Sequence, residues 1–272
     1  MANAPKLLVT GAASGLGAAV HHALGGTALT RATRFDAVAA GASYDAIIHC
    51  AFGAQKLVTP ATAHAYLDDN VLLTERLAQI PHRKFVFISS IDIYPQPRRG
   101  AKEDDDYDLA RLSGPYPFVK LFSDALVRAR CANHLVLRPT SLIGPVMRPS
   151  TTLRVLTEAN SRVHLHPDSR FNFVLHEDIV VFIARALTED ITGVYNVAST
   201  GVVSLGEMAE RLGLAATFGD HVYDAGDISN AKIAAIEPRF RRTSAETLNR
   251  FIEQLGPRFV GKGRMPTRNP SF

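Results

Sequence analysis

Short apolar runs alternate with longer amphipathic stretches through the first half of the chain. Five apolar runs have the length of β-strands, at residues 6–10, 27–31, 45–51, 84–90 and 134–144. Between them, apolar positions recur at helical spacing in residues 18–24, 65–80 and 116–130. Strands that alternate with helices indicate βαβ units, whose right-handed crossovers place helices on both faces of a parallel sheet. The pattern therefore predicts an α/β fold with a doubly wound parallel sheet.

The pattern loosens after residue 142. It predicts a helix, a strand that leads into a helix, a short strand and a last helix, at residues 147–162, 170–187, 193–199 and 204–213. Ser204 and Glu207 have the spacing of a capping box at the start of that last helix. We divide the chain into a main domain, a smaller lobe and a basic flexible tail, at residues 1–142, 143–256 and 257–272. Within the lobe, residues 171–198 are expected to return to the main sheet.

The composition is that of a globular protein. Hydrophobic residues make up 46% of the chain and charged residues 21%, which are ordinary proportions for a folded domain. Cys50 and Cys131 are far apart in the sequence and form no CxxC motif, which favours a reducing compartment. The sequence has no apolar run of membrane-spanning length, and its first apolar run is too short for a signal peptide. We therefore expect a cytoplasmic protein without a membrane partner.

The formal net charge of +4 comes from one end of the chain. Residues 256–272 carry four basic side chains and no acid: Arg258, Lys262, Arg264 and Arg268. The rest of the chain is formally neutral, so it lacks the charge excess of a nucleic-acid-binding domain. We expect no nucleic-acid partner.

The first candidate site is a glycine-rich turn between the first strand and the first helix. Its sequence is Gly11-Ala-Ala-Ser14-Gly15-Leu16-Gly17. In this place, backbone N–H groups and the helix dipole can bind a pyrophosphate, and glycine lets the phosphate oxygens approach the backbone. Glycine turns also join many strands to helices for structural reasons alone. The position directly after the first strand favours a dinucleotide-binding, Rossmann-like domain.

The second candidate site combines a tyrosine, a lysine and two serines. Tyr116 and Lys120 are four residues apart on one face of a predicted helix. A free tyrosine titrates at about pH 10, and a neighbouring cation favours its phenolate, which would make it an acid or base near neutrality. Ser89 and Ser90 directly follow a strand, where a hydroxyl can hydrogen-bond a substrate carbonyl. Serines in such places also commonly cap turns.

Six motifs, in this order, resemble the extended branch of the short-chain dehydrogenase/reductase superfamily, the NAD(P)-dependent epimerase/dehydratases that act on nucleotide sugars. The resemblance covers about residues 6–210. The motifs are "DAIIHCAFGAQ", "DDNVLLTERL", "FVFISSIDIYP", "YPFVKLFSDALV", "LVLRPTSLIGP" and "FNFVLHEDIVVFIARAL".

The resemblance implies a catalytic trio and a nicotinamide cofactor. Ser90 would hold the substrate oxygen, Tyr116 would move a proton, and Lys120 would bind the nicotinamide ribose and lower the pKa of Tyr116. Together with Tyr116 and Lys120, the expected cofactor contacts are Gly11, Ser14, Gly15, Leu16, Gly17, Arg31, Ala51, Phe52, Asn70, Ser89, Pro139 and Thr140. The residues expected to face a small-molecule substrate are Phe52, Ser90, Ile91, Asp92 and Ser141. The resemblance also implies a homodimer.

Several positions depart from that family's pattern. The glycine spacing is GxxxGxG, Pro95 follows Tyr94 where the family has glycine, and Ser141 stands where it often has asparagine. Phe171 takes the approximate place of a diphosphate-binding arginine, with Arg170 one position earlier. These departures favour a reductase acting on a secondary alcohol or ketone of a sugar or sugar nucleotide. Two alternatives stay open: a nucleotide-sugar epimerase that retains NAD, and a non-catalytic cofactor-binding regulator.

The residues after the second strand bear on the choice of cofactor. This strand ends in Thr30 and Arg31, and Arg34 follows shortly. NAD enzymes of this fold usually carry an acid there for the ribose 2′-hydroxyl, whereas arginine binds a 2′-phosphate. The charge favours NADP over NAD, although Asp36 could supply the acid from further along.

A cluster of histidines and acids in the lobe raises the question of a metal. Its members are His164, His166, Asp168, His176, Glu177 and Asp178. Histidine and carboxylate are ligands for transition metals, but scattered histidines are more often structural, and the family pattern accounts for Asp178. We expect no metal.

Overall fold

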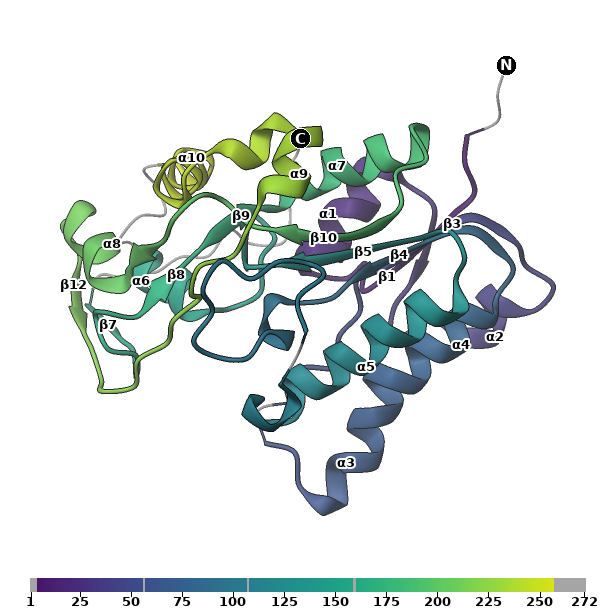
Figure 1. The fold of residues 1–272 in the computed structure, drawn as a ribbon, viewed down its shortest axis with the longest axis horizontal. Coiled ribbons are helices and arrows are strands. Elements are labelled where there is room, and N and C mark those ends of the chain that lie inside the picture. The colour runs from purple at the N-terminus through teal and green to yellow at the C-terminus, as the bar shows by residue number, and fades with distance from the viewer. Residues whose placement is uncertain (1–3, 56, 107, 159, 257–272) are drawn as a thin grey trace.

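The computed structural model describes residues 4–55, 57–106, 108–158 and 160–256, so the tail expected at residues 257–272 lies outside the described ranges. A six-stranded parallel sheet forms its centre, in the order β10-β5-β4-β3-β1-β2 (Figure 1). Its strands are β1 Leu7–Thr10, β2 Thr27–Leu29, β3 Tyr44–His49, β4 His82–Ile88, β5 His134–Pro139 and β10 Gly193–Val197. The prediction of a doubly wound parallel sheet is confirmed.

Successive strand residues point to opposite faces of the sheet, and both faces are covered by helices (Figure 1). The helices nearest the main sheet are α1 Gly15–Leu24, α2 Phe35–Ala39, α3 Pro60–Leu67, α4 Leu73–Gln79, α5 Pro115–Arg130, α7 His176–Thr188 and α9 Ala231–Ile236. Val9 and Val86 belong to the apolar cluster that includes residues of α1, α7 and α9. Leu8 and Phe85, their sequence neighbours, belong to the cluster that includes residues of α4 and α5. The continuous apolar runs in the sequence are therefore explained by burial on both faces.

The strand order reverses between β1 and β3. After β2, the chain passes through the short α2 and returns to pair with the other side of β1. In open α/β sheets, ligands bind at the carboxyl ends of the strands at such a reversal. Gly11 follows β1 there, and a Cβ on Gly11 would lie 2.9 Å from the backbone nitrogen of Ala51, which follows β3. Glycine thus allows these two strand ends to approach each other.

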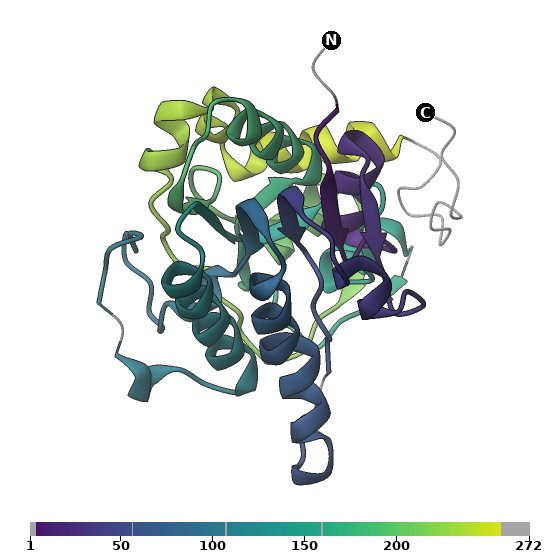
Figure 2. The same cartoon turned by 90° about the vertical axis from the view of Figure 1, so that its right-hand side faces the viewer.

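The helix predicted at residues 65–80 contains a π-helical turn, Asp68–Leu72, which joins α3 to α4. A π turn inserts an extra residue into a helix and often marks a functional site. Within this turn the Asn70 carbonyl accepts hydrogen bonds from Thr74 Oγ1 at 2.8 Å and from Ser123 Oγ of α5 at 3.2 Å. Figure 2 shows α3 extending away from the sheet beyond this turn.

A buried ion pair fixes α5 to the sheet. Arg138 of β5 and Asp124 of α5 have fully buried side chains, and their Nε and Oδ2 atoms are 2.9 Å apart. Arg138 also donates a hydrogen bond to the Tyr94 hydroxyl at 2.8 Å, in the segment after β4. A buried charge without its partner is strongly destabilising, so this pair holds α5 and the end of β4 in a fixed relation.

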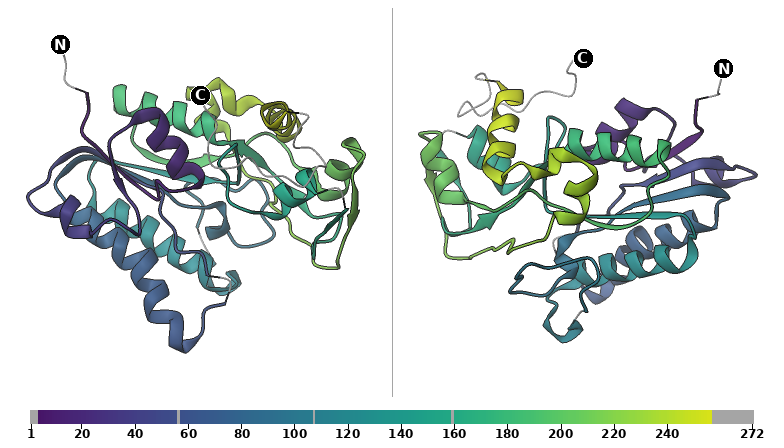
Figure 3. Two further views of the ribbon diagram at one scale, coloured as in Figure 1. Left: turned by 180° about the vertical axis from the view of Figure 1, so that it is seen from behind. Right: turned by 45° about the horizontal axis from the view of Figure 1, so that its top comes forward.

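The smaller lobe lies at one end of the main sheet (Figure 3). Its elements are β6 Ser141–Ile143, α6 Thr151–Thr157, β7 Asn160–Arg162, β8 Arg170–Phe171, β9 Phe173–Leu175, β11 Val203–Ser204, α8 Leu205–Arg211, β12 Ala215–Thr217 and α10 Ser244–Leu255. Three strand pairs, β6 with β9, β8 with β11 and β7 with β12, surround a separate apolar cluster. Between β9 and β11, the chain returns to the main sheet through α7 and β10.

Two predictions for the lobe had different outcomes. The helix expected at residues 147–162 is confirmed only for Thr151–Thr157: residues 147–150 are not helical, and residues 160–162 pair with β12 instead. That pairing joins segments far apart in the sequence, and local periodicity does not detect it. The capping box is confirmed: Ser204 Oγ accepts from Glu207 N at 3.1 Å, and Glu207 Oε2 accepts from Ser204 N at 2.8 Å. No helix in the described ranges is long and apolar enough to cross a membrane.

Candidate active site

Two cavities lie side by side along the carboxyl edge of the main sheet. The larger has a volume of about 650 Å³ and is lined by residues that follow β1, β2 and β3. The smaller, of about 300 Å³, is lined by the start of α1 and by residues that follow β4 and β5. Three residues line both cavities: Ser14, Phe52 and Arg148. The two spaces therefore form one elongated site with a narrow point.

The glycine turn forms one wall of this site. Gly11 and Ser14 line the larger cavity, and Ser14, Gly15, Leu16 and Gly17 line the smaller one. A Cβ on Gly17 would lie 2.4 Å from the Gly11 carbonyl oxygen, so glycine is required for α1 to begin this close to β1. Ser14 is the N-cap of α1 but makes no side-chain capping hydrogen bond. The Gly15 N–H donates to the Val146 carbonyl, so an anion at the start of α1 would be bound by the N–H groups that follow.

Arg148, which the sequence analysis did not identify, crosses the narrow point. Its Nε donates to Ser14 Oγ at 3.3 Å, and its Nη1 donates to the Phe52 carbonyl at 3.3 Å. The same loop contacts the glycine turn through its backbone, since Gly15 N donates to the Val146 carbonyl at 2.8 Å. A guanidinium is therefore held beside the N-terminus of α1, where two sources of positive potential add.

Residues expected to discriminate between NADP and NAD line the larger cavity. Thr30 and Arg31, which follow β2, line it together with Arg76 of α4. Arg31 forms an exposed ion pair with Asp69 at 3.3 Å, a kind of pair that contributes little to stability. Asp36 is not among the residues that line this cavity. The strand end carries a cation and no acid of its own.

Tyr116 and Ser90 meet at the smaller cavity, as the sequence predicted. Burial and the nearby Asp92 carboxylate raise the pKa of Tyr116 above its usual value, and a hydrogen bond with Ser90 lowers it only in part. The ring of Phe52 packs edge-on against Tyr116, with 5.0 Å between their centroids. Tyr116 is therefore a protonated phenol at neutral pH.

Lys120 lines the same cavity but does not act as expected on Tyr116. Its Nζ donates to the Ile88 carbonyl at 2.7 Å and lies 4.8 Å from the Phe52 ring centroid. Burial lowers the pKa of Lys120 to about 8. The expectation that Lys120 lowers the pKa of Tyr116 is wrong for this structure, because burial and Asp92 dominate and raise that pKa.

Asp92 occupies the turn after Ser90. Its backbone N–H donates to Ser90 Oγ at 3.1 Å, and its Oδ1 accepts from Arg98 Nη2 at 2.7 Å. The Asp92 side chain is partly exposed, whereas that of Arg98 is buried. The second carboxylate oxygen, Oδ2, accepts from Ser90 Oγ at 3.4 Å, so the protein holds both oxygens of Asp92.

The other predicted contacts divide into cavity residues and supporting residues. Ala51, Ser89, Pro139 and Thr140 line one or other cavity, as expected. Asn70 does not line either, but its side chain hydrogen-bonds to Gly53 N at 2.9 Å and to the Gly53 carbonyl at 3.2 Å. It therefore fixes the segment after β3.

Three of the expected substrate contacts, Ile91, Asp92 and Ser141, line neither cavity. Ile91 is in the apolar core with Ile93 and Tyr94, because the short helical turn Ile91–Ile93 directs both isoleucines inward. The expectation that Ile91 faces the substrate is therefore not met. Ser141 begins β6, where its backbone pairs with Asn172, and it lines neither cavity.

At the position where the family has an arginine for the substrate diphosphate, this chain has Phe171 in an aromatic cluster, next to Arg170 in an ion pair. Phe171 stacks on Phe173, with 5.8 Å between ring centroids, and also packs on Tyr223. Arg170 pairs with Asp224 at 2.5 Å. The positive charge of Arg170 is thus matched within the protein.

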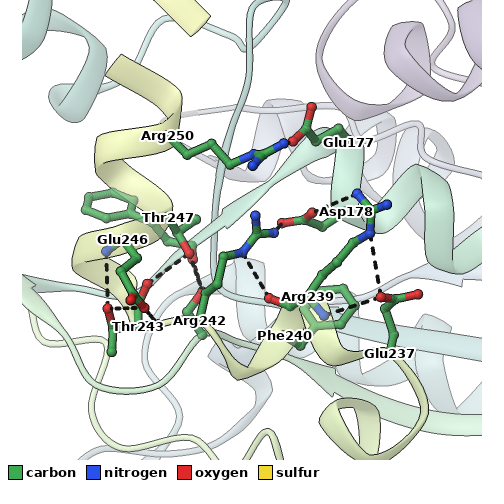
Figure 4. Close-up of polar contacts among 12 residues, drawn as sticks. Glu177, Asp178, Glu237, Arg239, Phe240, Arg242, Thr243, Glu246, Thr247 and Arg250 are labelled. Atoms are coloured by element: carbon green, nitrogen blue, oxygen red, sulfur yellow. Dashed lines mark hydrogen bonds and ion pairs between the residues drawn. The ribbon is translucent and has the colours of Figure 1, made fainter. Parts of the chain in front are cut away.

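Two acids of the histidine and acid cluster are paired with arginines. Arg250 pairs with Glu177 at 2.9 Å, and Arg242 pairs with Asp178, so arginines that follow β10 in the sequence neutralise both acids of the first α7 turn (Figure 4). No group of three metal-binding side chains occurs in the part of the chain that the structure describes.

The model of the NAD dependent epimerase/dehydratase family matches residues 7–198 of this chain. A search of curated proteins found no match to this chain. A solved structure of UDP-glucuronic acid 4-epimerase from Bacillus cereus, in complex with UDP-glucuronic acid and NAD, is similar at a TM-score of 0.72 and 18% identity, over 92% of this chain and 99% of that chain.

Two further solved structures have the same fold. The dTDP-4-dehydrorhamnose reductase from Yersinia enterocolitica is similar at a TM-score of 0.69 and 21% identity, over 91% of this chain and 99% of that chain. RMD from Pseudomonas aeruginosa, complexed with NADPH, is similar at a TM-score of 0.69 and 22% identity, over 92% and 98% of the two chains.

Proposed function

This chain belongs to the NAD dependent epimerase/dehydratase family, and from that premise we propose that it is a ketoreductase for a sugar or sugar nucleotide. The observation that carries the proposal is the meeting of Tyr116, Ser90 and Lys120 at the smaller cavity. A regulator that only binds a cofactor would not need a protonated phenol beside a serine hydroxyl at that point. The alternative class is therefore less well supported by the site.

The residues present fit a dinucleotide cofactor. The elongated site has two compartments joined at the N-terminus of α1, which matches two nucleotide halves joined by a diphosphate. The smaller compartment contains buried polar atoms without a protein partner, Ser89 Oγ and His176 Nδ1. Gly11, Ser14, Gly15 and Gly17 would hold the diphosphate with Arg148, and Pro139, Thr140 and Lys120 would hold the nicotinamide half.

The protein's own part in the reaction is to place and donate a proton. When bound, the cofactor supplies the hydride. Ser90 Oγ donates a hydrogen bond to the substrate carbonyl oxygen and fixes it beside the Tyr116 hydroxyl. Tyr116 is protonated at neutral pH, as a free tyrosine would be, and can give its proton to that oxygen as the alcohol forms; the raised pKa makes it a weaker acid than a free tyrosine.

The nature of the neighbours supports a sugar-nucleotide substrate, since their names include UDP-glucuronic acid and dTDP-4-dehydrorhamnose. In this chain, Arg170 is already paired with Asp224, so a substrate diphosphate would have to compete for that cation. This difference favours a substrate that carries less negative charge than the nucleotide-diphosphate sugars on which the family usually acts. It also favours the reductase over the epimerase.

NADP is the proposed cofactor, with NAD as the alternative. The cavity wall after β2 presents Arg31 and, from α4, Arg76. Each is in an exposed ion pair, with Asp69 and Asp68 respectively, so a 2′-phosphate would compete with these carboxylates. Guanidinium groups form charge-assisted hydrogen bonds to a 2′-phosphate.

A homodimer is proposed from the exposed apolar side chains on one group of helices. Phe118 and Phe122 are exposed and one turn apart on α5, and Leu67 and Leu72 are exposed at the neighbouring α3 and π turn. Large apolar side chains gathered in this way usually mark an interface. Leu121, on the other side of α5, packs inward near the Ile91 cluster.

The proposal is tested by two measurements on the purified protein. NADPH and NADH oxidation is followed with a panel of keto-sugars and nucleotide keto-sugars, and mass spectrometry identifies any cofactor retained through purification. Reductase activity without retained cofactor is the expected result. Substrate epimerisation with retained NAD would favour the epimerase, and binding without turnover of any substrate would favour the regulator.

A further inference from the structure

His176 is the first residue of α7, and its side chain lines the smaller cavity. Only 3% of the residue is exposed, yet Nδ1 has no hydrogen-bond partner among the residues that the structure describes. A buried polar atom without a partner costs free energy, and such atoms are uncommon in native proteins. The unpartnered Nδ1 of His176 therefore destabilises the folded protein, and no hydrogen bond within the described residues compensates for it.

The backbone that carries His176 is held firmly. The next two residues, Glu177 and Asp178, pair with Arg250 and Arg242 (Figure 4). On the other side, the imidazole lies against Gly144, where a Cβ would be 2.5 Å from Nδ1. Glu177 and Asp178 Oδ2 are paired, whereas Asp178 Oδ1 and His176 Nδ1 have no hydrogen-bond partner among the described residues. Of the two side chains with an unpartnered atom, only that of His176 lines the smaller cavity. The turn thus presents the imidazole in a fixed position.

The charge state of His176 limits what it can bind. Burial lowers the pKa of His176 to about 4, so the ring is neutral at physiological pH. A neutral imidazole has one N–H donor and one nitrogen acceptor. It therefore suits an uncharged polar group, whereas the phosphates would be bound by Arg148 and the start of α1. Ser89 Oγ, the second buried atom without a partner, lines the same cavity and can also donate and accept.

We propose that His176 is a cofactor-binding residue that hydrogen-bonds to the carboxamide of the nicotinamide ring. The inference rests on the proposed cofactor function, in which the adenosine half lies with Arg31 in the larger cavity and the nicotinamide half lies with Tyr116 in the smaller one. A carboxamide is uncharged and has both an acceptor oxygen and N–H donors. It matches the hydrogen-bonding capacity that His176 leaves unused.

The test compares two ligands that differ only in the nicotinamide. Dissociation constants of NADPH and of 2′-phospho-ADP-ribose, which lacks the nicotinamide ring, are measured by calorimetry for the parent protein, His176→Leu and His176→Gln. NADH and ADP-ribose replace them if NADH binds more tightly. We expect His176→Leu to weaken NADPH binding about tenfold and to leave the fragment unchanged. His176→Gln, which keeps an amide donor and acceptor, should recover most of the lost affinity.

Controls separate this role from a structural one. His82→Leu changes a histidine at the amino end of β4, opposite the site, and should alter neither constant. Gly144→Ala keeps the imidazole but displaces it, so a selective loss of NADPH affinity is expected even if His176→Leu fails to fold. Equal weakening of both ligands, or of neither, by folded variants would overturn the proposal. Failure of the parent protein to bind either ligand would refute the proposed function itself, and the role of His176 with it.

Discussion

Arg148 and Phe52 are joined across the narrow point of the site by a hydrogen bond of 3.3 Å from the arginine Nη1 to the phenylalanine carbonyl. Arg148 belongs to the loop that enters the lobe, whereas Phe52 follows β3 of the main sheet. The bond therefore links the two parts of the chain where a diphosphate would pass. A bound diphosphate would give this guanidinium a stronger, charged acceptor.

Replacing Arg148 should weaken cofactor binding. In Arg148→Gln, the loss of a charge-assisted hydrogen bond is expected to raise the NADPH dissociation constant roughly tenfold. The salt dependence of binding should also become less steep, as titrations at two ionic strengths would reveal. Arg154→Gln, which changes an exposed arginine of α6 that pairs with Glu158, is the matched control. An unchanged affinity in Arg148→Gln would remove Arg148 from the site.

Tyr116→Phe tests the proton donor. The variant lacks the hydroxyl but keeps the ring that packs on Phe52, so kcat should fall by about a hundredfold or more while NADPH affinity stays within a few-fold. Tyr44→Phe, whose hydroxyl bonds to the Val38 carbonyl outside the site, should keep its activity. Turnover of Tyr116→Phe near that of the parent would show that another group donates the proton.

Lys120 should reduce stability at neutral pH. Its pKa is lowered to about 8 from 10.5, so between these values the folded state binds fewer protons than the unfolded state. The free energy of unfolding therefore rises with pH across this window, and the cost is fully present below pH 8.

Removing the charge should relieve that cost. Lys120→Met is expected to be more stable than the parent by about 2 kcal/mol at pH 7, in urea unfolding, although it is inactive. The difference should shrink towards pH 10. Lys102→Met, at an exposed lysine, should show no such trend. A Lys120→Met protein that is less stable at pH 7 would contradict the prediction.

Arg31→Ala tests the choice of cofactor. If Arg31 binds the 2′-phosphate, the variant should lose about tenfold in NADPH affinity and little in NADH affinity, as paired titrations would show. The Arg31–Asp69 pair is exposed, so stability should hardly change. Tighter binding of NADH than NADPH by the parent protein would reverse the proposed preference.

The double variant Phe118→Ser, Phe122→Ser tests the homodimer. Both rings are exposed on α5, and their loss should convert a dimer to a monomer in sedimentation at micromolar concentration. Leu109→Ser, at an exposed leucine of another segment, should remain dimeric. A parent protein that sediments only as a monomer would exclude this interface.

The hydrophobic pattern predicted the main sheet because strands buried on both faces leave continuous apolar runs, as in residues 84–88. The same logic placed Tyr116, Ser90 and the glycine turn at one sheet edge. Arg148 and His176 were not found in this way. Arg148 comes from the loop after β6 and His176 from the start of α7, and they reach the site only because that loop bonds to Gly15 and because α7 packs beside Gly144. No local periodicity encodes those contacts.

The direction of the Tyr116 pKa shift was also not predicted from the sequence. A lysine four residues from a tyrosine predicts a lowered tyrosine pKa only if the ammonium lies beside the phenol. Here Lys120 turns to the Ile88 carbonyl, and Asp92, fixed by Arg98, lies near Tyr116 instead. Burial of Tyr116 is the larger cause of its raised pKa, and Asp92 adds to it.

The π turn at Asp68–Leu72 makes this helix sensitive to the insertion or deletion of a single residue within the turn. Each residue of an α-helix rotates the next by about 100°, so removing one codon from this turn would restore a regular helix. Everything before it would then be rotated relative to everything after it. Leu77, after the turn, would still face the core, but Tyr66, before it, would swing away from Phe52, against which it now packs. A one-residue deletion at this point would therefore change the packing against Phe52, which lines both cavities, while leaving the sheet intact.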